Sequence, residues 1–138
     1  MPDLACELAE YQAHEERHRS VFAAELTRRG IRRCRSFLLC ACGGMTLGIV
    51  TGLMGRKAIA ATTVAVERVV LRHLEDQKKL LATVDPAAVG AIEQIEMDER
   101  AHHDLSARDL GQQMWWQRIL MATVSASTEG VIWLGMRL

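Results

Sequence analysis

The sequence predicts an all-α protein with a single domain. Its 138 residues suffice to bury one hydrophobic core but not two. Apolar residues make up 49% of the chain and charged residues 25%, which excludes a disordered tail. Only two prolines and 4% aromatic residues disfavour a β-sandwich or barrel, and the apolar residues recur at helical spacing. The zero net charge argues against a nucleic-acid partner, because such binding depends on excess Lys and Arg.

The first half of the chain predicts a helix, a charge-free segment and another helix. Residues 3–29 form an amphipathic pattern that starts after Pro2, with Asp3 as a cap, and ends before Gly30. Residues 36–55 follow without a charged side chain. Residues 56–81 then carry apolar side chains at the spacing of a helix.

The second half predicts two further helices. Asp85-Pro86 forms a turn or a helix start with proline at the first helical position. A polar, acidic helix is expected from there to about Leu110, and a last helix from about Met114 to Leu134. Because no low-complexity linker interrupts the pattern, we expect residues 1–138 to form one domain of four or five helices.

The charge-free segment 36–55 allows three interpretations. As a helix it would be about 30 Å long, close to the thickness of a bilayer core. It is a buried core helix or hairpin, a segment on a membrane surface, or a transmembrane span. Gly44, Gly48 and Gly52 form a pattern that permits close approach of another backbone. Basic residues on both sides of the segment favour contact with anionic lipid.

The cysteines predict no metal site and no disulfide framework. Cys6, Cys34, Cys40 and Cys42 form no Cys-x-x-Cys pair. We expect four reduced thiols that act as small apolar residues, which fits a reducing compartment. The first residues lack the basic start and apolar core of a signal peptide, so none is expected.

Two Glu-x-x-His motifs give the strongest chemical signal. One joins Glu15 to His18 and the other joins Glu99 to His102. Residues three apart lie on one helical face, so each pair can hold a metal ion. Glu67 is a lone carboxylate on an apolar helix face, where it would be costly unless it were bound. This layout matches ferritin-like di-iron proteins, while the alternative is a set of solvated surface charges.

From about Glu15 to the C-terminus the chain resembles the demethoxyubiquinone hydroxylases, which are ferritin-like di-iron enzymes of ubiquinone biosynthesis. The segments that carry the resemblance occur in order and nearly without gaps: Glu15-Glu16-Arg17-His18, Leu47-Gly48, Thr51-Gly52-Leu53-Met54-Gly55, Thr63-Val64-Ala65-Val66-Glu67, His73 with Gln77, Asp98-Glu99-Arg100-Ala101-His102-His103-Asp104, and Arg137-Leu138.

The resemblance implies a ferritin-like helical bundle, two iron ions, and a monooxygenase that hydroxylates the ring of a lipid quinol. The ligand positions would be held by Glu15, His18, Glu67, Glu99 and His102, and the ligands would be oriented by His73, His103 and Asp104. A single crossing by residues 36–55 would separate the ligands, so we expect peripheral attachment to a membrane surface. The implied location is the cytoplasmic face of a bacterial inner membrane or the matrix face of the mitochondrial inner membrane.

Two departures from the family bear on these expectations. A helix with a sixth ligand, a Glu, precedes the first Glu-x-x-His helix in the family, and Met1 begins where the second helix should begin. We therefore expect an incomplete bundle without the first helix. Leu74 also stands where the family tends to have Tyr. The missing carboxylate leaves one positive charge of two ferrous ions unbalanced. The candidate sources of the missing carboxylate are Glu129, a second copy of the chain, or another protein that fills the groove left by the missing helix.

Three functions remain open on the sequence. The first is an oxygen-activating di-iron hydroxylase. The second is a non-catalytic relative that serves as a helical accessory subunit of a membrane complex or as a quinone-binding protein. The third is a helical protein that binds another metal, since two Glu-x-x-His motifs also suit manganese.

Overall fold

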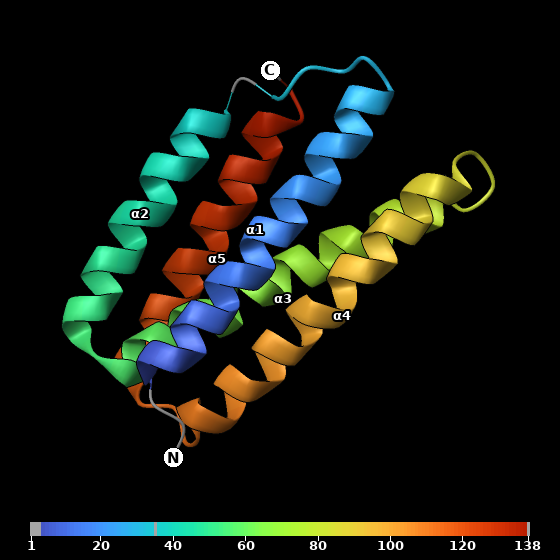
Figure 1. Ribbon diagram of the computed structural model, residues 1–138. Helices are drawn as coiled ribbons and strands as arrows, with labels where there is room; N and C mark the ends of the chain where they lie inside the picture. The colour runs from blue at the N-terminus through green and yellow to red at the C-terminus, as the bar shows by residue number, and fades with distance from the viewer. Residues whose placement is uncertain (1–3, 35, 138) are drawn as a thin grey trace.

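The computed structural model describes residues 4–34 and 36–137, and this part of the chain contains five α-helices and no strand (Figure 1). The all-α bundle predicted from the sequence is confirmed. The helices are α1 (Leu4–Arg28), α2 (Phe37–Met54), α3 (Arg56–Leu81), α4 (Pro86–Leu110) and α5 (Trp115–Gly135).

Local capping residues set the ends of these helices. The Asp85 side chain accepts a hydrogen bond of 3.1 Å from the backbone N–H of Ala88, and Pro86 is the first residue of α4. Gly55, at φ +92°, is the single residue between α2 and α3. The predicted cap Asp3 lies outside the described residues.

Helix α3 forms the centre of the molecule and packs against α4 and α5. Its inner face is rich in alanine and valine, so the neighbouring helices approach it closely. One core cluster joins α3 to the end of α4 and to α5 through Ala60, Ala61, Val64, Ala65, Leu110, Met121 and Val124. A second cluster joins α3 to the start of α4 through Leu74, Ile92 and Ile95.

An ion-pair network holds the start of α1 against this core. Arg56, the first residue of α3, donates a hydrogen bond of 2.9 Å to Glu7 and also pairs with Asp109 near the end of α4. Glu7 is buried, so its carboxylate depends on this guanidinium for compensation. The network fixes α1 in the orientation that turns Glu15 and His18 toward α3 and α4.

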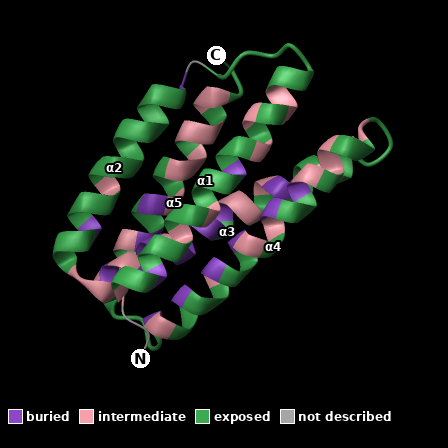
Figure 2. Cartoon of the chain, viewed as in Figure 1, coloured by how far each residue is buried: buried purple, intermediate pink, exposed green. Residues whose placement is uncertain are grey.

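Helix α2 differs from the other helices because almost all of it is exposed, whereas buried residues gather on α3 and α4 (Figure 2). Within the described residues it is the one helix long and apolar enough to cross a membrane. This corrects the interpretation of residues 36–55 as a buried core helix or hairpin. The segment is a continuous helix whose large apolar side chains face outward.

Within the described residues of this chain, no other backbone packs closely against the glycines of α2. A Cβ atom built on Gly44, Gly48 or Gly52 would meet nothing within 4 Å. Instead these glycines line a groove of about 400 Å³ between α2 and α3. This α2–α3 groove is bounded by Leu8, Gly44, Leu47, Gly48, Thr51, Gly52, Ile59, Thr62, Thr63, Val66 and Glu67.

Candidate metal centre

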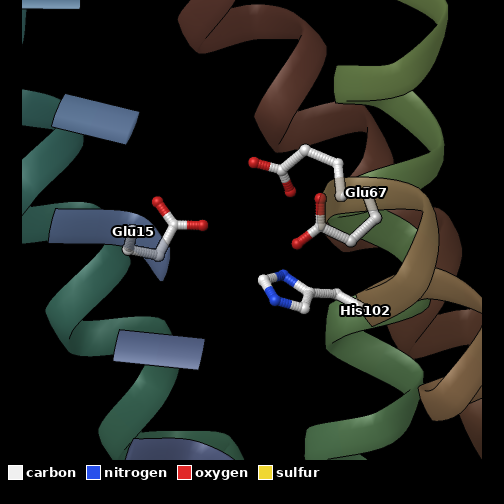
Figure 3. Close-up of side chains that lie close together, drawn as sticks. Glu15, Glu67 and His102 are labelled. Carbon is white, nitrogen blue, oxygen red and sulfur yellow. The ribbon is translucent and has the colours of Figure 1, made fainter. Parts of the chain in front are cut away.

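Four of the predicted ligands meet at one point between α1, α3 and α4. Glu15, Glu67, Glu99 and His102 each offer a ligand atom, and these atoms all lie within 4.8 Å of one another. Figure 3 shows Glu15 pointing from α1 across to Glu67 and His102 on the opposite side. Glu67, Glu99 and His102 are buried, whereas Glu15 is the exposed member of the group.

His18 lies beside the same group. Its Nδ1 atom is 3.0 Å from Glu99 Oε1, and the imidazole is buried. The two atoms do not align as a hydrogen bond, so Nδ1 has no hydrogen-bond partner. The structure therefore brings together all five residues that the sequence predicted as ligands.

The carboxylates of this group cannot easily be ionised together. Burial raises the pKa of Glu67 far above its ordinary value, and a hydrogen bond with Glu99 and the charges of Glu99 and Glu15 raise it further. Although Glu15 is exposed as a whole residue, the surrounding protein partly desolvates its carboxyl group and raises its pKa, with the charge of Glu99 as the next cause. A bound cation would remove this penalty, because it would replace protons as the counter-charge.

The donor set fits a transition metal. Three carboxylates and two imidazoles are the oxygen and nitrogen ligands that iron and manganese accept. Two buried atoms, Glu67 Oε2 and His18 Nδ1, have no hydrogen-bond partner, and the lone pair of each could bind a metal ion instead. The same residues in a purely structural role would leave these polar atoms uncompensated.

Two residues that the sequence analysis did not single out contact the imidazoles of the group. His18 Nε2 is 2.9 Å from Asp98 Oδ2, and His102 Nε2 is 2.9 Å from His14 Nδ1. Tyr11 also stacks near His102, with 4.1 Å between ring centroids. His14 and Asp98 each immediately precede the Glu of a Glu-x-x-His motif. That shared position is the signal that could have identified them.

Electrostatics differ between these two contacts. Burial acts to raise the pKa of Asp98, but hydrogen bonds from His18 and Arg17 outweigh it and hold the pKa below its usual range. Asp98 is therefore an anionic acceptor. Burial lowers the pKa of His102, although the charge of Glu99 opposes this effect, so His102 favours the neutral form that binds metals.

The residues expected to orient the ligands lie elsewhere, which corrects that expectation. His73 is hydrogen-bonded to Glu129 of α5 at 2.9 Å, and His103 is hydrogen-bonded to the exposed Asp104 at 3.0 Å. The reason is helical geometry, since each residue turns the side chain by about 100°. His73 follows Glu67 by six residues and therefore points to another face of α3.

Glu129 is likewise not placed to serve as a sixth ligand. It pairs with His73 and Arg72 across the α3–α5 interface, outside the group of ligand atoms. Its position in an apolar stretch of sequence is explained by these two partners.

A cavity of about 240 Å³ opens beside the metal group. This metal-side cavity is lined by four of the predicted ligands, by Arg19 and by apolar residues, namely Glu15, His18, Arg19, Phe22, Val66, Glu67, Val70, Leu74, Ile95 and Glu99. Val66 and Glu67 line both this cavity and the α2–α3 groove. The two spaces therefore share Val66 and Glu67 as part of their walls.

Comparison with known proteins found similar sequences. A curated relative, the 3-demethoxyubiquinol 3-hydroxylase of Rhodospirillum rubrum, is 27% identical over 125 residues, which cover 91% of this chain and 59% of the relative. The chain thus spans about three-fifths of the length of that relative. No solved structure matches the chain. A family model described as ubiquinone biosynthesis protein COQ7 matches residues 1–135, and the chain belongs to that family.

Proposed function

We propose that this protein is a di-iron hydroxylase that acts on the ring of demethoxyubiquinol. The observation that carries the proposal is the convergence of three carboxylates and two imidazoles, from three helices, on one largely buried point. Membership of a ubiquinone biosynthesis family and the hydroxylase from Rhodospirillum rubrum support it.

In this proposal the carboxylates of Glu15, Glu67 and Glu99 neutralise two iron ions, and His18 and His102 supply nitrogen donors. Bound iron would supply the activation of dioxygen for ring hydroxylation. Hard oxygen donors suit a metal that cycles between ferrous and ferric states. The protein's own contribution is to hold these donors in fixed positions and to limit water with the apolar lining of the metal-side cavity.

A fourth carboxylate from outside the described residues would complete the charge balance. The three carboxylates of the group leave one of the four positive charges of two ferrous ions unbalanced. The metal-side cavity lies open between α1 and α3, where such a side chain could reach the ions. A second copy or another protein segment is the proposed source.

The α2–α3 groove is the proposed binding site for the lipid tail of the quinol. Its glycines leave open space along α2, and Glu67, a member of the metal group, is one of its lining residues. The hydroxyl of Thr62 is buried, has no hydrogen-bond partner and lines the groove, so it can donate to an oxygen of the bound quinol.

The family and the exposed apolar helix α2 together indicate association with a membrane. We propose that α2 lies in the membrane surface and does not cross it. Glu15 precedes α2 and Glu67 follows it, yet their ligand atoms meet. A crossing would either separate them or carry exposed charges such as Arg17 and Arg68 into lipid. The proposed face is cytoplasmic in bacteria or that of the matrix in mitochondria.

Elemental analysis of purified protein tests the metal centre. We expect about two irons per chain in the wild type, as in carboxylate di-iron sites. Glu67→Ala and His102→Ala should lose the iron while circular dichroism shows that the helices remain. Glu93→Ala, which removes an exposed carboxylate of α4 outside the group, is the matched control. Unchanged iron in the two ligand variants would refute the assignment, and manganese in place of iron would refute the oxygen-activating role.

Filling the groove tests the path of the substrate. Gly48→Leu should abolish hydroxylation of demethoxyubiquinol while leaving the iron content unchanged, because the new side chain occupies the open space along α2. Gly43→Leu adds the same side chain at an exposed glycine of α2 that does not line the groove. Equal activity of both variants would show that the quinol binds elsewhere.

A further inference from the structure

We infer that His14 is a positioning residue for His102, and that it makes the two histidine ligands of the metal centre chemically unequal. The inference rests on the proposed metal centre. It follows from a contact between α1 and α4, the two helices that carry the Glu-x-x-His motifs. The contact joins His102 to His14, a residue that belongs to neither motif.

The contact fixes the direction of the His102 ring. His14 Nδ1 lies 2.9 Å from His102 Nε2, and the two rings stack with centroids 5.1 Å apart at an angle of 16°. His102 is buried, with only 3% of its surface exposed, so water cannot replace this partner readily. Because Nε2 is engaged by His14, Nδ1 is the nitrogen of His102 that remains for a metal ion.

The chemistry of imidazole then assigns the hydrogen. A histidine that binds a metal through Nδ1 carries its proton on Nε2, which donates to a nearby acceptor. That acceptor is His14 Nδ1, which can accept this hydrogen bond only in the His14 tautomer that has its hydrogen on Nε2. His14 holds His102 in one tautomer and one ring orientation without contacting the metal itself.

The other histidine ligand has the same contact with a different acceptor. His18 Nε2 lies 2.9 Å from the carboxylate of Asp98. His14 precedes Glu15 as Asp98 precedes Glu99, so the two contacts are related by exchange of the two motifs. An anionic acceptor draws the Nε2 proton more strongly than a neutral imidazole and makes the bound ring a stronger donor.

Two metal subsites of unequal affinity follow from this difference. The subsite of His18, supported by Asp98, binds the more tightly, and the subsite of His102, supported by His14, binds the more weakly. Substitution of the residue at position 14 should change the weaker subsite and leave the tighter one in place.

Titration of the metal-free chain with Co(II), followed by its visible ligand-field bands, tests the inference. The wild type should bind Co(II) in two separable steps. His14→Ala should weaken the second step about 10- to 100-fold, which is the usual effect of removing such a partner. His14→Asn, whose amide oxygen can accept the same hydrogen bond, should restore most of the loss. His14→Asp should bring the two steps together, because both histidines then have carboxylate acceptors.

A control variant and the contrary outcomes distinguish failure of this inference from failure of the proposed metal centre. His103→Ala removes the neighbouring histidine, whose hydrogen bond goes to Asp104, and should leave both steps unchanged. An unaltered second step in His14→Ala would overturn this inference while leaving the metal centre intact. A wild type that binds no Co(II) would overturn both. If His14→Ala loses helical structure, equal binding by His14→Asn and His14→Asp would overturn the inference.

Discussion

Replacing Glu67 with glutamine should stabilise the metal-free protein and abolish its stabilisation by metal. Glu67 is 8% exposed and its pKa lies far above the ordinary value of 4.5. The folded state therefore keeps a proton on Glu67 that the unfolded chain releases once the pH passes 4.5. Above that pH the folded state binds more protons than the unfolded state, so its stability falls as the pH rises.

The size of this free-energy penalty follows from the difference between the ordinary pKa of Glu67 and the pH of the experiment. Each pH unit above 4.5 adds about 1.4 kcal/mol to the penalty. At pH 7 the buried carboxyl group therefore costs the metal-free fold up to about 3.5 kcal/mol. Glutamine has nearly the same shape and never ionises, so Glu67→Gln should raise the melting temperature at pH 7 by about 10 °C. At pH 5 the gain should shrink to less than about 1 kcal/mol.

Thermal unfolding in the presence of a chelator, followed by far-ultraviolet circular dichroism at pH 5 and pH 7, measures this difference. Glu93→Gln, at an exposed position of α4, should leave the melting temperature unchanged at both pH values. Adding Fe(II) under anaerobic conditions should stabilise the wild type and not Glu67→Gln. A metal-free Glu67→Gln that is no more stable than the wild type at pH 7 would refute the reasoning.

Two further predictions concern the ends of the bundle and its membrane surface. Arg56→Ala should lower the free energy of unfolding, because Glu7 is left buried without its partner. Urea unfolding measures the loss, and adding Glu7→Gln should recover part of it. If the double variant is no more stable than Arg56→Ala, the buried charge is not the cause. Leu53→Glu should weaken binding to anionic lipid vesicles by at least tenfold, because Leu53 of α2 is 86% exposed and would be buried in the interface. Leu80→Glu, at a 76% exposed leucine near the end of α3, is the matched control in a vesicle co-sedimentation assay, and equal loss in both variants would contradict a specific role of α2.

The helix boundaries and the pairing of two donors within each Glu-x-x-His motif could be predicted because both depend on short-range spacing. The Asp85-Pro86 pair determines the start of α4 from residues that are adjacent in the chain. A Glu-x-x-His motif places two donors on one helical face whatever the surrounding fold. Local geometry was therefore sufficient for these features.

The partners of the ligand histidines could not be predicted in this way. His14 and His102 are separated by 88 positions, and their contact depends on how α1 docks on α4. The same limitation explains the wrong expectation for His73, whose nearness to Glu67 in sequence does not place it on the same face. For the glycine pattern of α2, spacing alone cannot show whether another backbone lies opposite, and in the part of this chain that the structure describes none does.

The docking of α1 differs in kind from the packing of the other helices. The core clusters among the described residues consist of buried side chains from α3, α4 and α5. Helix α1 packs Val21 against the edge of the second cluster and makes polar contacts at Glu7 with Arg56 and at His18 with Asp98. Arg29, directly after the end of α1, pairs with Asp85. Salt screens such contacts but strengthens apolar packing. High ionic strength should therefore release α1 as a separate cooperative unit, so that its amide hydrogens exchange with solvent before those of α3. A bound metal ion would hold the middle of α1 against the bundle. The free energy of releasing α1 would then depend on the concentration of the metal.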